Sequence, residues 1–171
     1  MPVLRIIYQK KLVAKFVSAN YVGRIFERSL RRLQIGLMFS QGFNRRVRMR
    51  FGPPLAIGIE GRNEIIDVYV RNMNISCQFI KKNLNEILPG GLDVVDCKHF
   101  QESEKSLTYP SRAVYVVKIP DDKKFVLPQT WKITSIKDDI MEIEISLEKF
   151  KHKELFDIFG PSGIIERFLI F

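Results

Sequence analysis

Cysteine and histidine are scarce in this sequence, and their positions exclude several kinds of metal chemistry. The chain contains Cys77, Cys97, His99 and His152 and no other residue of either type. Two cysteines cannot build a disulfide framework, and no CxxC or CxxxCxxC cluster is present to hold zinc or an iron–sulfur cluster. We therefore expect this chain to hold no metal ion and no cofactor.

Uninterrupted apolar runs are also missing. The N-terminal segment is broken by Arg5, Lys10, Lys11 and Lys15, so it has neither the apolar core of a signal peptide nor the length of a membrane span. A phosphate-binding loop, a dinucleotide-binding glycine motif and a Ser/His/Asp signature are absent as well. We expect a cytoplasmic protein that has no membrane partner and does not carry out catalysis alone.

Acidic residues are scarce in the first third of the chain. Residues 1–62 contain 13 Lys and Arg against 2 Asp and Glu, a net charge of +11. Residues 63–171 contain 15 against 17, a net charge of −2, and the two parts sum to the +9 of the whole chain. Because the positive charge is concentrated in one region, the sequence predicts a polyanionic partner for its N-terminal third.

Hydrophobic periodicity predicts an α+β fold for the first hundred residues. Apolar residues at helical spacing indicate helices at residues 19–33 and 76–88. Strands are expected at residues 3–8, 45–51, 64–70 and 92–100, with residues 55–59 resuming the second strand and a turn at residues 61–63. The order β-α-β-β-α-β is that of the ferredoxin-like split unit.

The remaining sequence predicts a linker and a second, strand-rich part. Residues 101–112 are polar and rich in turn formers, so we assign residues 1–100 to a ferredoxin-like basic domain and residues 113–171 to a β-rich half packed on it. In that half we expect strands at residues 113–119, 131–136, 140–147 and 167–171, and a short helix at residues 154–159. It is either a strand-rich extension of the first sheet or a second, incomplete α+β half.

Eight arginines lie within 27 residues of the basic third and form the candidate binding surface. On a helical wheel, the arginines of the first helix lie opposite its apolar side. Those of the following strand alternate with Val47, Met49 and Phe51. Guanidinium groups bind phosphate bidentately, and a loop aromatic can stack on an unpaired base. The candidate RNA-binding residues are Arg24, Arg28, Arg31, Arg32, Phe43, Asn44, Arg45, Arg46, Arg48 and Arg50.

Purely structural interpretations of these residues stand beside the functional one. A charged helix face is usually only solvated, and a loop aromatic such as Phe43 often plugs the edge of a core. Glu27 lies at helical spacing from Arg24 and Arg31 and can pair with either. The arginines could instead meet an acidic stripe in this chain or in a partner. In this chain the stripe consists of Glu142, Glu144 and Glu148.

Several segments resemble a known family. They are residues 26–32 (FERSLRR), 40–51 (SQGFNRRVRMRF), 54–61 (PLAIGIEG), 64–70 (EIIDVYV) and 88–94 (LPGGLDV). The combination resembles the uncharacterised radical SAM-linked protein family, mainly over the first 100 residues. Members of that family are encoded beside, or fused to, a radical S-adenosylmethionine protein, often near ribonuclease and ribosomal-protein genes. This resemblance implies an accessory role in RNA modification or ribosome biology. The family has His and Asp where this chain has Ala19 and Tyr21. This departure favours binding over catalysis.

Three functions are compatible with these patterns. The first is a non-catalytic module that binds RNA through its arginines and assists a radical SAM enzyme acting on RNA or the ribosome. The second is a subunit that docks such an enzyme through the arginines without contacting RNA. The third is a metal-independent RNA endonuclease, which needs a general base near a 2′-hydroxyl. The available groups are His99 and His152, with Tyr21 and Tyr109 as weaker substitutes.

Overall fold

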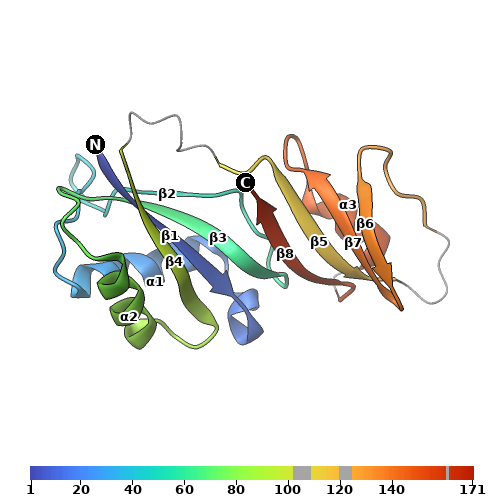
Figure 1. Cartoon of the computed structure of the whole chain (residues 1–171), viewed down its shortest axis with the longest axis horizontal. Helices are drawn as coiled ribbons and strands as arrows, with labels where there is room; N and C mark the ends of the chain where they lie inside the picture. The colour runs from blue at the N-terminus through green and yellow to red at the C-terminus, as the bar shows by residue number, and fades with distance from the viewer. Residues whose placement is uncertain (102–108, 120–124, 161) are drawn as a thin grey trace.

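A single sheet runs through the whole molecule. The computed structural model describes residues 1–101, 109–119, 125–160 and 162–171. In this part of the chain three α-helices and one short 3-10 helix accompany eight strands. The strand order is β4-β1-β3-β8-β5-β7-β6, and β2 pairs with β3 outside this path (Figure 1). The α+β class predicted from the sequence is confirmed. No helix of the described residues is long and apolar enough to cross a bilayer.

The first half of the sheet has the topology of a ferredoxin-like unit. β1 (Pro2–Lys10) lies in the middle and pairs antiparallel with both β3 (Glu60–Tyr69) and β4 (Leu92–Gln101). β2 (Met49–Phe51) is short and pairs antiparallel with the second half of β3. The resulting strand order, fourth-first-third-second, is that of the split β-α-β-β-α-β unit.

Two helices cover one face of this half. α1 (Ala19–Arg32) and α2 (Cys77–Ile87) lie on the same side of β1, β3 and β4 (Figure 1). Ser18 caps α1, and Ser76 caps α2 in the same way, because each hydroxyl accepts a hydrogen bond from the amide three residues later. Apolar side chains of the helices and strands form the first core. Its fully buried members include Leu4, Ile6, Phe26, Leu30, Ile66, Val68, Ile80 and Leu84.

The second half repeats this topology without one helix. Its strands, in sheet order, are β8 (Ile164–Ile170), β5 (Arg112–Lys118), β7 (Ile140–Ser146) and β6 (Lys132–Lys137). Matched in chain order, this is again fourth-first-third-second, and α3 (His152–Phe159) precedes the fourth strand as α2 does. Between β5 and β6 the described residues form no helix. The second half is therefore an incomplete α+β unit that also extends the first sheet.

The two halves meet along one edge of β3. β2 occupies the later part of that edge, and β8 pairs in parallel with its beginning at Glu60 and Gly61. Leu55, Ile59 and Ile65 belong by sequence to the first half but pack into the second core with α3, β5, β7 and β8. The division at residues 101–112 stays a prediction, and residues 102–108 lie outside the described residues.

Two local predictions are wrong around this junction. Residues 61–63 do not turn but lie inside β3, where Gly61 pairs with Lys10 on one side and Arg167 on the other. Asn63 does not serve a turn because its side chain bonds the backbone N–H and C=O of Leu169, at 2.7 and 2.8 Å. Residues 55–59 form no strand, and Leu55 and Ile59 pack into the second core.

The strand predicted at residues 45–51 is also shorter than expected. Residues 45–48 form no regular strand and lie against residues 38–40, through hydrogen bonds from Ser40 N to Arg46 O and from Arg48 N to Met38 O, both 2.8 Å. A single bridge joins Phe39 and Val47. Regular pairing with β3 begins only at Met49. The chain here is a tight loop that returns to the sheet.

A buried ion pair joins the two halves. The guanidinium of Arg167 on β8 donates to the carboxylate of Glu64 on β3, with Nη2–Oε2 at 2.6 Å and Nε–Oε1 at 3.2 Å. It also donates to the carbonyl oxygens of Pro53 and Pro54, at 2.9 and 2.8 Å. Both charged side chains are almost completely buried. Burial acts to lower the pKa of Arg167, but the Glu64 carboxylate outweighs burial and raises it.

Removing one member of this pair should be costly. We expect Arg167→Met to lower the free energy of unfolding by about 3–5 kcal/mol, because Glu64 would then be a buried charge without its partner. Urea denaturation measures the loss. The double variant Glu64→Leu/Arg167→Met should recover much of it.

The control is Arg112→Met, which breaks an exposed pair with Glu144. That change should cost less than about 1 kcal/mol. Equal losses for the two single variants would mean that the junction pair contributes no more than a surface contact.

Candidate functional site

α1 presents its arginines on the side away from the core. Val22, Phe26 and Leu30 are buried against the sheet, so the residues opposite them face outward. Gly23 lies on the buried side next to the ring of Phe51: a Cβ there would lie 2.9 Å from the Phe51 Cζ, so the ring would have to shift. The helix and the chain around β2 therefore approach closely, with Arg24, Arg28 and Arg31 along the line where they meet.

The loop after Ser40 supplies the opposite wall. Its ends are tied together because Ser40 Oγ accepts from the amide of Arg46 at 3.1 Å, and Ser40 N donates to the Arg46 carbonyl at 2.8 Å. Gly42 has a φ of 128°, a conformation that strongly favours glycine. Phe43 at the tip is fully exposed to solvent, so the expectation that it plugs the edge of the core is wrong.

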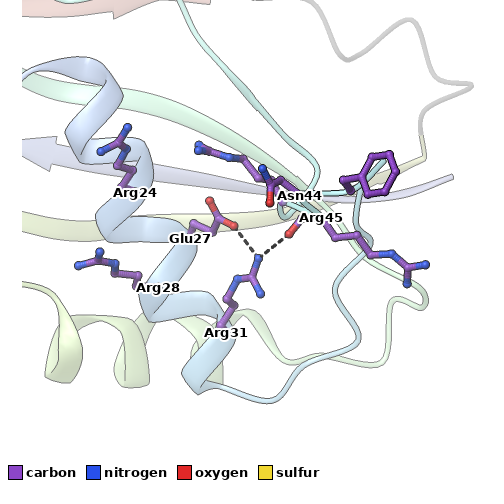
Figure 2. A pocket seen from close by; sticks show the side chains of 8 residues that line it. Arg24, Glu27, Arg28, Arg31, Asn44 and Arg45 are labelled. Carbon is purple, nitrogen blue, oxygen red and sulfur yellow. Dashed lines mark hydrogen bonds and ion pairs between the residues drawn. The ribbon is translucent and has the colours of Figure 1, made fainter. Parts of the chain in front are cut away.

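The helix and the loop border an open hollow of about 640 Å³. Its lining consists of Arg24, Glu27, Arg28, Arg31, Phe43, Asn44, Arg45 and Arg46. We call it the arginine pocket. Figure 2 shows Arg24, Glu27, Arg28 and Arg31 on α1, and Asn44 and Arg45 on the loop beside it. Five arginines and one carboxylate, Glu27, thus come together among the described residues.

Glu27 and Arg31 hold the two walls together. The Oε1 atom of Glu27 accepts from Arg31 Nη2 at 2.8 Å and from the amide of Val47 at 3.3 Å. Arg31 Nη2 also donates to the carbonyl of Arg45 at 3.0 Å, the second contact drawn in Figure 2. The predicted pairing of Glu27 with Arg31 is confirmed. Both side chains are therefore engaged in shaping the pocket.

The charge of Glu27 is stabilised by these contacts. Partial burial acts to raise its pKa, but hydrogen bonds from Arg31 and the Val47 amide, and the charges of Arg31 and Arg46, outweigh burial and lower it. In the described part of the chain, the guanidinium groups of Arg24, Arg28, Arg45 and Arg46 form no hydrogen bond or ion pair. The donors of these four guanidinium groups are therefore available to a ligand, and that of Arg45 points away from α1 (Figure 2).

A second hollow of about 520 Å³ continues the arginine pocket along α1. It shares Arg24, Glu27 and Arg46 with the first and is bounded further on by Phe51 and Pro54. Its floor is more apolar, since Val47, Met49 and Phe51 turn toward the helix. The groove as a whole runs from the exposed Phe43 to the start of α1.

Three of the predicted arginines lie elsewhere. Arg32 is exposed at the end of α1 and does not line the pocket. Arg48 and Arg50 lie on the opposite face of the sheet, because Val47 and Met49, which alternate with them, face the first core. Arg48 lies 4.2 Å from the ring centre of Tyr69, and Arg50 Nη1 donates to the Tyr69 hydroxyl at 3.3 Å. The row expected along one strand is thus divided between two faces.

A buried network on that opposite face was not predicted. Arg5 on β1 bonds Asp67 on β3 through two contacts, of 2.7 and 2.9 Å, and Tyr109 donates to the same carboxylate at 2.7 Å. The ring of Phe100 lies 5.2 Å below the Arg5 guanidinium. One sequence signal could have indicated this network, because Arg5 and Asp67 are opposite charges in the middle of two otherwise apolar strands. The strand register places these two residues side by side.

The remaining candidates lie away from the arginine pocket. His152 is bonded to the hydroxyl of Tyr115 at 3.1 Å in the second core, where burial lowers its pKa to about 4. His99 on β4 contacts the carbonyl of Ile75 at 2.7 Å. In the acidic stripe, Glu144 pairs with Arg112 rather than with a candidate arginine. Neither His99 nor His152 lines the arginine pocket.

The Glu27 contacts lead to a pH-dependent expectation. The pKa of Glu27 is lower in the folded chain than in the unfolded chain. The ionised carboxylate therefore stabilises the fold fully at pH values above its unfolded-state pKa, and this stabilisation is lost as the pH falls through its folded-state pKa. We expect Glu27→Gln to lose about 1–2 kcal/mol of unfolding free energy at pH 7. That difference from wild type should shrink below about pH 4.

Urea denaturation at several pH values measures the difference. Glu86→Gln, on the exposed side of α2, is the matched control and should leave the stability unchanged. A Glu27→Gln loss that stays constant down to pH 3 would show that its carboxylate charge is not what joins helix and loop.

Comparison with known proteins places the chain in a family but does not name an activity. No curated protein matches the chain significantly. A family described as uncharacterized proteins conserved in bacteria (DUF2344) matches residues 4–158. The match extends well beyond the first 100 residues that carry the sequence resemblance, and it makes no reference to a radical SAM enzyme. The chain belongs to this family of uncharacterized bacterial proteins.

Proposed function

We propose that this protein is a non-catalytic module that binds RNA in the arginine pocket and along the groove beside α1. One observation supports the proposal: four arginines from two chain segments line a single hollow, and their guanidinium groups form no hydrogen bond or ion pair among the described residues. Bringing five like charges together with a single carboxylate to compensate them is unfavourable, so such a cluster is best explained by an anionic ligand. RNA supplies regularly spaced phosphates for several guanidinium groups at once.

The other lining residues favour a nucleotide over a simple anion. Phe43 is fully exposed beside Asn44 and Arg45, at the rim of the pocket. An exposed aromatic ring can stack on an unpaired base, and an amide side chain can bond a base edge. The arrangement therefore favours single-stranded RNA, or an RNA with an unpaired base.

The chemistry of the pocket supports binding rather than cleavage. Its one carboxylate, Glu27, accepts from Arg31 and Val47, and its lowered pKa makes it a weak base. The two histidines considered as general bases bond groups outside the pocket. In the family that the sequence resembles, His and Asp stand where this chain has Ala19 and Tyr21. An RNA endonuclease is accordingly the weaker alternative.

The biological setting that we propose rests on the family resemblance. We infer that the module assists a radical SAM enzyme that modifies RNA or the ribosome, by presenting RNA to it. The alternative is a subunit that docks this enzyme through the arginines alone. The RNA-presenting module and the docking subunit differ in one measurable property. Only the RNA-presenting module requires the isolated chain to bind RNA.

Phosphate contacts should appear as a salt-dependent affinity. We expect the wild type to bind a short single-stranded RNA, measured by fluorescence anisotropy over a salt series. In Arg45→Glu/Arg46→Glu, the slope of log affinity against log salt should fall by about 1.4, since each single-strand phosphate contact contributes about 0.7. The matched control is Lys132→Glu/Lys137→Glu, which makes the same charge change on the exposed strand β6. An equal fall of the salt slope in the two variants would mean that the affinity comes from net charge alone. If folded wild-type protein does not bind RNA at low salt, the proposal is wrong.

Stacking on Phe43 should be visible separately. We expect Phe43→Ala to weaken single-strand binding by about 1–3 kcal/mol and to leave the salt slope unchanged, because the ring carries no charge. Duplex RNA, whose bases are not available for stacking, should bind both forms equally. Phe43→Tyr should restore the affinity. An equal loss for single strand and duplex would assign Phe43 to the shape of the loop instead.

A further inference from the structure

The only two cysteines of the sequence lie on facing elements of the first core. Cys77 is the first residue of α2, and Cys97 lies on β4. Cys97 is buried in that core, whereas Cys77 is partly exposed and packs against it. Both are free thiols. Neither lines the arginine pocket, so the RNA-binding proposal gives them no role.

Two contacts fix how the chain around α2 lies over β4. The ring of His99 on β4 contacts the carbonyl of Ile75, just before the helix, with Nε2–O at 2.7 Å. Lys81 within the helix donates from Nζ to the carbonyl of Val95 on β4, at 2.9 Å. The earlier residue of the helical segment thus meets the later residue of the strand. The helix therefore runs antiparallel to β4.

This arrangement places the two cysteines opposite each other. Cys77 lies between the two contacting residues of the helical segment, and Cys97 lies midway between the two contacting residues of the strand. Helical spacing puts Cys77 on the same side of α2 as Ile80 and Leu84, which are fully buried against the sheet. The two cysteine side chains therefore meet across the interface between helix and sheet.

The two thiols differ in their exposure to an oxidant. Burial raises the pKa of the Cys97 thiol, and a hydrogen bond with the Cys77 side chain raises it further. Cys97 therefore keeps its proton and is shielded by the core. Because Cys77 is partly exposed, an oxidant dissolved in water reaches it first. An accessible sulfur next to a shielded one is the arrangement of an oxidised and a resolving cysteine.

A metal ion is the other ligand that a pair of cysteines can bind. Structural zinc sites use four ligands from cysteine and histidine. In the part of the chain that the structure describes, no group of three or more His, Cys, Asp or Glu side chains is placed to hold a metal ion. The ring of His99, two residues after Cys97, is bonded to the Ile75 carbonyl instead. The geometry favours a bond between the two sulfurs.

We propose that Cys77 and Cys97 are a site of reversible covalent modification, at which hydrogen peroxide produces an intramolecular disulfide. The Cys77 sulfur attacks one peroxide oxygen, the O–O bond breaks, and a sulfenic acid and one water are formed. The Cys97 sulfur then attacks the sulfenic sulfur. Its S–H proton leaves with the displaced hydroxyl as a second water. Two thiols are oxidised and one peroxide is reduced, and a dithiol reductant reverses the change.

The disulfide would tie the start of α2 to an outer strand of the sheet. β4 is the last strand on its side of the sheet order, and it pairs with β1 alone. A covalent link at this edge would hold helix and strand together when either begins to open. This inference does not depend on the RNA-binding proposal, because it concerns α2 and β4 rather than α1 and the loop after Ser40.

Oxidation of the purified full chain by an equimolar amount of hydrogen peroxide tests the proposal. Intact mass under non-reducing conditions should fall by two hydrogen atoms, and peptide mapping should find the peptides of Cys77 and Cys97 joined. Dithiothreitol should restore the original mass. In Cys97→Ser the cross-link should be absent, and dimedone should trap the sulfenic acid on Cys77. In Cys77→Ser the mass should stay unchanged. Circular dichroism checks that both variants are folded.

A comparison within the wild type removes any dependence on the variants. The disulfide should form about tenfold faster or more in the folded chain than in urea, because the fold holds the two sulfurs together. A folded chain that gains oxygen atoms without a cross-link would overturn the proposal. So would a disulfide between two copies of the chain, a cross-link that dithiothreitol does not reverse, or a rate no higher in the folded chain than in urea.

Discussion

The arrangement of the molecule depends on a charged pair that lies out of reach of water. Arg167 and Glu64 come from strands in different halves, and the same guanidinium fixes the carbonyl oxygens of Pro53 and Pro54. Those prolines directly follow β2, and Pro54 borders the groove beside α1. One buried cation thus determines both how the halves join and where one wall of the candidate site stands.

The arginines of this chain fall into two groups with different electrostatic roles. Arg5 and Arg167 are buried, and each is matched to a carboxylate on a neighbouring strand. Those of the arginine pocket share a single carboxylate, Glu27, which is used to join helix and loop. The scarcity of acid in the first 62 residues therefore leaves the exposed group without compensation. This imbalance, more than the number of arginines, makes a ligand-binding surface the best interpretation.

Periodic signals made much of the fold predictable, whereas long-range contacts did not. The serine caps and apolar spacing located α1 and α2, and the outward side of α1 follows from the same spacing. The turn expected at residues 61–63 was wrong because Asn63 bonds a strand 106 residues away, which no local pattern can indicate. Some of the residues predicted to form the binding surface line the arginine pocket, and others do not. The alternation of residues 45–51 correctly places Arg48 and Arg50 on the side of their segment opposite the apolar residues. It could not indicate that the helix arginines Arg24, Arg28 and Arg31 lie on the opposite face of the sheet from Arg48 and Arg50.

The position of β8 has a consequence for the order in which the chain can fold. Glu64 and Arg167 are 103 residues apart in the chain. At ribosomal rates of about 5–20 residues per second, Arg167 is synthesised on the order of 5–20 s after Glu64. Until then the beginning of β3 also lacks its parallel neighbour. The first half therefore emerges with an open strand edge and an unmatched charge, and both are satisfied in a single late step. Pairing over such a distance along the chain makes folding slow, and it links the completion of the N-terminal half to the arrival of the last strand.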